Sequence, residues 1–78
     1  MPHYFFDTRD DAHFIEDVVG LDLPDIEAAK VQAATSLAEL ARDVLPSSVK
    51  RKMSVEVRES LRPVLVAVLQ FEAVLVPA

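Results

Sequence analysis

The sequence contains no cysteine and only one glycine, Gly20. Without cysteine, neither a disulfide nor a thiolate zinc site can form. With one glycine, the chain has no glycine-rich loop that could cradle a phosphate and no Gly-x-Ser-x-Gly nucleophile elbow. A single core of this size supplies only about 3–5 kcal/mol of net stability. Because disulfides and thiolate metal sites are excluded, we expect oligomerisation to supply additional stability.

Positive charge and long apolar runs are also scarce. The formal net charge is −5, which argues against a general affinity for nucleic acid or anionic lipid. The one basic run, residues 50–52, lacks the neighbouring aromatic side chains on which bases would stack. No segment approaches the roughly 20 apolar residues of a membrane span, and the N-terminus does not resemble a signal peptide. Apolar residues form 51% of the chain, so we expect one folded cytoplasmic domain, residues 1–78.

The N-terminal part of the chain predicts a β-hairpin. Residues 4–8 and 14–18 are rich in aromatic and β-branched side chains, and the turn-like residues 9–12 separate them. Gly20 follows this hairpin, where we expect it to adopt a backbone angle that other residues resist.

A helix is predicted after the hairpin. Asp25 is a natural N-cap, because its carboxylate can accept hydrogen bonds from the first free amides, and Pro46 stops the helix. Apolar residues recur at steps of three and four and form one stripe. The stripe comprises Ile26, Ala29, Ala33, Leu37, Leu40, Ala41 and Val44.

A second hairpin is predicted in the C-terminal part. Residues 53–58 alternate cleanly between apolar and polar, as a half-exposed strand does, and residues 63–71 form the last strand. The predicted fold is therefore α+β, with the order ββαββ and one helix packed on one face of a four-stranded, mainly antiparallel sheet. Two strand orders fit this pattern. The order 2-1-3-4 is all antiparallel and puts the last strand at an edge, whereas 2-1-4-3 puts it in the centre and parallel to the first strand.

The last strand is apolar on both of its alternating faces. Residues 63–71 carry no charge, although a strand with one face in water should alternate between apolar and polar residues. If the hairpin closes with a four-residue loop, Val57 lies opposite Val64, and this pair faces the helix. The other face then carries an exposed apolar patch, which we expect to bind a partner. The predicted patch comprises Phe5, Phe14, Leu65, Leu69 and Phe71.

Two alternatives remain for what covers this patch. One is a partner protein, most simply a second copy in a homodimer, and the other is the chain itself, with residues 72–76 folded back. The dimer predicts that Leu65→Lys yields a folded monomer. The expected function is a non-enzymatic protein-interaction or regulatory module that needs no cofactor and binds neither nucleic acid nor membrane.

A different function class rests on the acidic first turn. Asp10 and Asp11 lie near His13, and loop carboxylates beside a histidine could bind a cation, although their spacing matches no calcium-loop pattern. The only other histidine, His3, is about 13 Å from Asp7 along an extended strand. The alternative function is therefore a small ligand-binding, metal-binding or catalytic domain centred on the first turn.

The chain resembles a family of short alphaproteobacterial proteins that are common in rhizobia. The resemblance rests on the opening Pro-His-Tyr-Phe-Phe-Asp, on the segment from Asp17 to Ala29, and on Val57-Arg58-Glu59 in the last hairpin. Asp22 stands where the family usually has glutamate, and Leu61 where it usually has glycine. The family is a domain of unknown function, so the resemblance implies a fold and a bacterial origin and supplies no catalytic residue.

Overall fold

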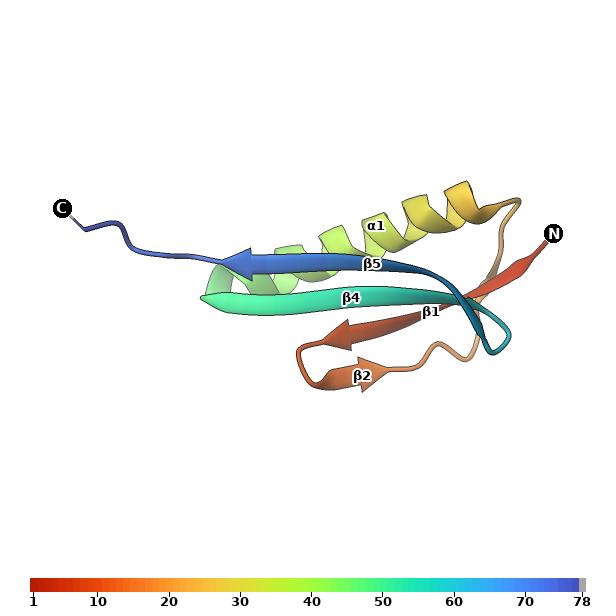
Figure 1. Cartoon of the computed structure of the whole chain (residues 1–78), viewed down its shortest axis with the longest axis horizontal. Helices are drawn as coiled ribbons and strands as arrows, with labels where there is room; N and C mark the ends of the chain where they lie inside the picture. Colours follow the sequence, from red (N-terminus) through yellow and green to blue (C-terminus); the bar gives the residue numbers. More distant parts are fainter. Residues whose placement is uncertain (78) are drawn as a thin grey trace.

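The residues of the two predicted hairpins form one antiparallel sheet, and the predicted helix lies on one of its faces (Figure 1). The computed structural model describes residues 1–77. Its elements are β1 (His3–Asp10), β2 (His13–Ile15), β3 (Leu21–Asp22), α1 (Ile26–Val44), the 3₁₀ turn η1 (Leu45–Ser47), β4 (Lys50–Glu59) and β5 (Arg62–Glu72). The predicted α+β class and the order of its main elements are confirmed. β4 begins at Lys50, before the predicted strand of residues 53–58, so the basic residues 50–52 belong to the sheet.

The strand order is β2-β1-β4-β5, with every neighbouring pair antiparallel, while the short β3 pairs with the start of β1. This is the all-antiparallel order of the two that the sequence allowed. The alternative with a central last strand is wrong. The eleven residues of β5 therefore pair with β4 on one side and form an edge of the sheet on the other.

The helix is positioned by its cap and its alanines. The Asp25 carboxylate accepts a hydrogen bond from the Ala28 amide at 2.9 Å, as predicted for an N-cap. Ala29 and Ala33 are fully buried, because their small side chains let the helix lie close to the sheet. The core consists of Tyr4, Ala29, Ala33, Leu37, Met53, Val55 and Val57.

A β-bulge near the start of β5 makes most of its side chains point to the face opposite to the predicted one. Arg58 pairs with Pro63, as the four-residue spacing predicts, but Val57 pairs with Leu65, so Val64 is an extra residue. Because side chains alternate along a strand, one extra residue moves every later side chain to the opposite face. Leu65, Ala67 and Leu69 therefore face the helix, and Val66 and Val68 face away from it.

The first hairpin is also tighter than predicted. Asp10 pairs with His13, which leaves only Asp11 and Ala12 in the loop, and Asp11 has a φ of 54°. A four-residue loop at residues 9–12 would pair Phe6 with Ile15, and this pairing is wrong. Thr8 lies opposite Ile15, while Phe6 pairs with Val57 in β4. Only two residues of the predicted second strand, Phe14 and Ile15, lie in β2.

Candidate functional site

The five residues of the predicted patch do not lie together. Leu65 and Leu69 are half-buried and pack against the core under the helix, and Phe71 lies on the same side of β5. Phe5 and Phe14 lie on the other face, where Arg58 and Arg9 cover their rings at 4.5 Å and 4.6 Å. The predicted patch is wrong as a continuous surface, because the bulge at Val64 moved the β5 side chains to the helix side. Leu65→Lys is accordingly expected to unfold the domain rather than to release a folded monomer.

The uncovered face carries a buried ionic network instead. Asp7 is only 6% exposed, and its carboxylate accepts hydrogen bonds from Arg58 Nε at 2.8 Å and from the Asp17 amide at 2.9 Å. Arg58 also donates to the carbonyl of Asp17 at 2.9 Å. The network joins β1, β4 and the segment after β2, three parts of the chain that are far apart in sequence.

Asp17 also organises the segment that leads to β3. Its carboxylate accepts hydrogen bonds from the amides of Phe6, Val19 and Gly20. Burial raises the pKa of Asp17, but these amides and the nearby Arg58 outweigh burial, so the pKa lies below its ordinary value. The pKa of Asp7 is lowered in the same way, since Arg58 and the Asp17 amide outweigh its burial. Both carboxylates are therefore held ionised by groups that fix the fold.

His3 closes the far end of the same segment. Its Nδ1 lies 2.6 Å from the Asp22 carboxylate and its Nε2 lies 2.8 Å from the Val19 carbonyl oxygen. Both partners are acceptors, so only the doubly protonated imidazolium can donate to both. Asp22, followed by the Val19 carbonyl, raises the pKa of His3 above its ordinary value of 6.5.

This arrangement predicts a pH dependence of stability. The folded state binds the His3 proton more tightly than the unfolded state does, so the stabilisation is complete below pH 6.5 and is lost as the pH rises through the folded pKa. We expect the midpoint of urea unfolding to fall across this interval. In Asp22→Asn, where the main cause of the shift is gone, the decrease should be smaller. An equal decrease in both proteins would contradict this role of His3.

The acidic first turn is engaged with β4. Both oxygens of Asp10 accept hydrogen bonds from Arg51, at 2.7 Å and 2.8 Å, and Asp11 accepts one from the Lys52 amide. The hydrogen bond from Arg51 is the main cause that lowers the pKa of Asp10. His13 is exposed. Within residues 1–77, no three histidine or acidic side chains come together as a metal site would require.

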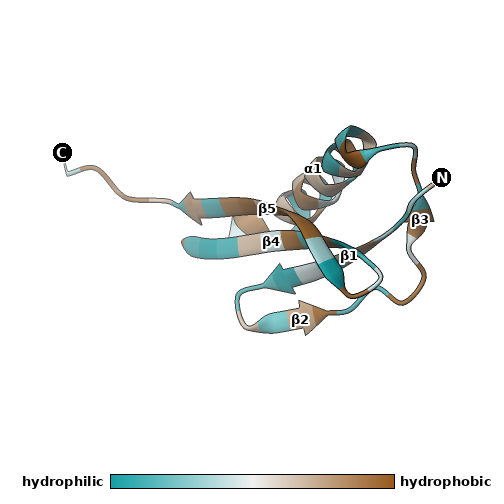
Figure 2. Cartoon of the chain, turned by 45° about the vertical axis from the view of Figure 1, so that its right-hand side comes forward, coloured by the Kyte–Doolittle hydropathy of each residue, from teal (hydrophilic) through white to brown (hydrophobic). Residues whose placement is uncertain are grey.

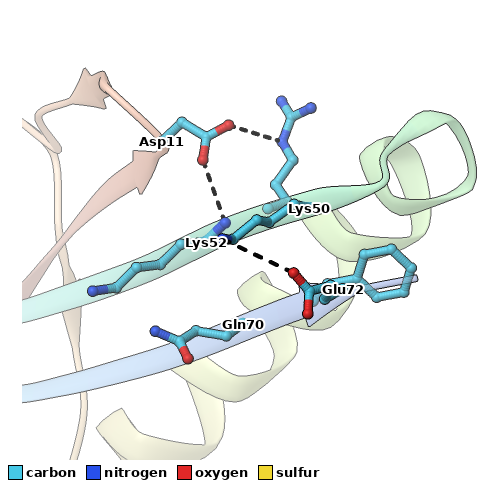
Figure 3. Close-up of a pocket in the computed structure, with 7 residues that line it drawn as sticks. Asp11, Lys50, Lys52, Gln70 and Glu72 are labelled. Atoms are coloured by element: carbon cyan, nitrogen blue, oxygen red, sulfur yellow. Dashed lines mark hydrogen bonds and ion pairs between the residues drawn. The ribbon is translucent and has the colours of Figure 1, made fainter. Parts of the chain in front are cut away.

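An open depression lies beside the start of β4 and the end of β5, with a volume of about 750 Å³ (Figure 3). Lys50, Lys52, Gln70 and Glu72 come from paired positions of β4 and β5 and share its lining. Lys50 lies 3.9 Å from Glu72, and both side chains are largely exposed. Exposed pairs of this kind contribute little energy. The depression thus offers a charged, solvated floor at the end of the sheet.

The most unusual surface of the molecule is the outer edge of β5. Val66 and Val68 are 55% and 53% exposed on the uncovered face. Beyond Glu72 the chain continues as an extended segment, residues 73–77, which projects past the sheet (Figures 1 and 2). The prediction that residues 72–76 fold back over the sheet is therefore wrong. Val74, Leu75 and Val76 are largely exposed. Sequence reasoning identified the last strand as apolar on both faces and gave an edge as one of its two possible places, but it selected the wrong set of exposed side chains.

A family model describes residues 3–70 of the chain as a domain of unknown function, DUF6894. The chain belongs to this family. The match confirms the expectation of a domain of unknown function. No curated protein and no solved structure matches the chain. No helix in residues 1–77 is long and apolar enough to cross a membrane.

Proposed function

We propose that this DUF6894 domain is a non-enzymatic protein-interaction module that self-associates through the outer edge of β5. The observation that carries the proposal is the edge itself. It is eleven residues long, pairs on one side only, and carries two exposed valines. A long apolar edge presents unpaired amides and carbonyls to any other strand, and soluble proteins usually block or pair such edges. Here Pro63, at the start of β5, blocks only that end of the edge.

The rest of the described surface supports a binding role more than a catalytic one. The carboxylates with lowered pKa values serve the fold: Asp7 and Asp10 pair with Arg58 and Arg51, and Asp17 accepts backbone amides. The depression beside β4 is open and lined by solvated charges. A catalytic pocket instead needs walls that exclude water around a few convergent polar groups. Pairing of an extended strand with a sheet edge, in contrast, needs only the free backbone groups that β5 offers.

Val68→Lys tests the proposal. Val68 lies on the uncovered face at the edge, so the substitution should leave the fold intact while it places a charge in the interface. A two-fold interface contains the change twice, and each lost valine contact is worth about 1.5 kcal/mol, so the dissociation constant should rise about a hundredfold. Sedimentation equilibrium measures this change directly.

The matched control is Val31→Lys, which places the same charge at an exposed valine on α1. The dissociation constant of this variant's dimer should equal that of the wild type. Circular dichroism should show an intact helix in both variants. A wild-type protein that sediments as an 8.6 kDa monomer at hundreds of micromolar would refute self-association.

A further inference from the structure

We infer that the β5 edge pairs with the β5 edge of a second copy about a two-fold axis through Phe71, so that residues 73–77 of each copy lie beside residues 65–69 of the other. This inference rests on the self-association proposed above and adds its register. In this arrangement Val66 lies opposite Val76 of the second copy, and Val68 lies opposite Val74 of the second copy. The two sheets become one, with both helices on the same face.

The direction of the backbone groups in β5 sets the first constraint. The Ala73 amide donates to the Val49 carbonyl at 2.8 Å, so the backbone groups of residue 73 point inward to β4. Backbone direction alternates along a strand of an antiparallel pair. The amides and carbonyls of Val66, Val68, Gln70 and Glu72 therefore point outward, toward the free edge.

Prolines and the bulge limit the usable edge. At one end, Val64 is the extra residue of the bulge and Pro63 has no amide to donate. At the other end, Pro77 again has no amide. The uninterrupted edge therefore runs from residue 65 to residue 76. An antiparallel register that pairs every outward group from Val66 to Val76 matches residue 66 with residue 76, which puts the axis at Phe71.

The same register covers the exposed apolar residues of the C-terminal segment. Val74, Leu75 and Val76 are 72%, 97% and 87% exposed in the single chain. In the pair, Val74 and Val76 lie beside the exposed valines of the second copy on the uncovered face. Leu75 lies beside Ala67 of the second copy, on the helix side. A register centred on Ala67 would instead leave all three side chains in water.

An apolar groove at the proposed axis is an independent observation. A shallow groove beside β5 is lined by Ala38, Ala41, Arg42, Leu45, Pro46 and Phe71. Because the backbone groups of Phe71 point inward, the two copies of Phe71 form a pair without hydrogen bonds, in which Cα atoms approach to about 4.5 Å. The two rings then lie close together across the axis and extend this groove.

The charges near the axis are compatible with this register. Glu72 lies opposite Gln70 of the second copy, rather than opposite another carboxylate. Lys50 and Lys52 lie on β4, one strand further from the axis, beside Glu72 and Gln70 of their own chain. Like charges directly opposite each other would destabilise the pair, and this register contains none.

Cysteine cross-linking tests the register. The wild-type chain has no cysteine, so Val68→Cys with Val74→Cys introduces the only two thiols. These positions are about 20 Å apart in one extended chain, so an internal disulfide is excluded. We expect mild oxidation to convert most of this variant to a covalent dimer on a non-reducing gel. The control, Val66→Cys with Val68→Cys, would cross-link only if the axis passed through Ala67, and we expect it to remain largely monomeric on the gel.

Sedimentation of the reduced protein shows whether it self-associates at all, independently of the register that cross-linking tests. A dimer that cross-links through residues 66 and 68, or that cross-links in neither variant, overturns the register and leaves self-association intact. A monomer that cross-links in neither variant overturns both. A reduced dimer that cross-links only through residues 68 and 74 supports both.

Discussion

Asp7→Ala is expected to unfold most of the protein at 37 °C. The substitution removes the carboxylate that pairs with Arg58 and accepts the Asp17 amide. Breaking a buried pair by removing one partner typically costs about 3–5 kcal/mol, because the other charge is left without compensation. A core of this size supplies about that much net stability in total. Urea unfolding followed by circular dichroism at several temperatures measures the loss.

The control for this prediction is Glu56→Ala. Glu56 lies opposite Asp7 in β4 and forms an ion pair with Arg9 at 3.4 Å, but both of these side chains are substantially exposed. An exposed pair contributes only about 0–1 kcal/mol, so this variant should unfold close to the wild type. Equal destabilisation by the two substitutions would show that burial of the Asp7 network is not what stabilises the sheet.

The helix was predictable because its signals are local. Asp25, the alanine-rich stripe and Pro46 lie within one segment, and each acts through its nearest neighbours. The strand order stayed open between two alternatives, because they differ only in which strand of the last hairpin pairs with β1, a contact between residues far apart in sequence. Periodicity and caps therefore predicted the fold class and the order of the main elements without any information about distant contacts.

The sequence did not allow a prediction of which β5 side chains face the helix. The pairing of Arg58 with Pro63 follows from the spacing, but the bulge at Val64 is invisible in a run of apolar residues that would fit either face. Both loops contain only two residues and place a non-glycine residue at positive φ, Asp11 in one and Ser60 in the other. Neither loop has the glycine or asparagine that usually marks a short hairpin at its positive-φ position, so the first loop was predicted too long.

The ionic network was missed because its members are far apart in sequence. Arg58 and Asp7 are separated by 51 positions, and only the pairing of β1 with β4 brings them together. A signal did exist. Asp17, Gly20 and Arg58 belong to the short motifs by which the chain resembles its family, and all three hold the segment between β2 and β3 in place. The motifs therefore describe the scaffold, while the β5 edge lies outside them.

Gly20→Ala is expected to be the most damaging conservative substitution in the segment between β2 and α1. Gly20 has a φ of +72°, a conformation that costs an L-residue about 1–2 kcal/mol. An added Cβ would also lie 2.5 Å from His3 Nε2 and 2.7 Å from the Tyr4 carbonyl oxygen. Tyr4 is a core residue, so its backbone cannot move without disturbing the packing under α1. We expect a total loss of about 2–4 kcal/mol, near the upper part of the range for single substitutions.

A double variant separates the two causes of this loss. His3→Ala removes the imidazole that the new Cβ would meet, but it changes neither the backbone angle at residue 20 nor the Tyr4 carbonyl. We therefore expect His3→Ala with Gly20→Ala to recover little stability relative to Gly20→Ala alone, as measured by the midpoint of urea unfolding in a double-mutant cycle. Nearly complete recovery would show that the His3 side chain, rather than the backbone conformation, is what requires glycine at this position.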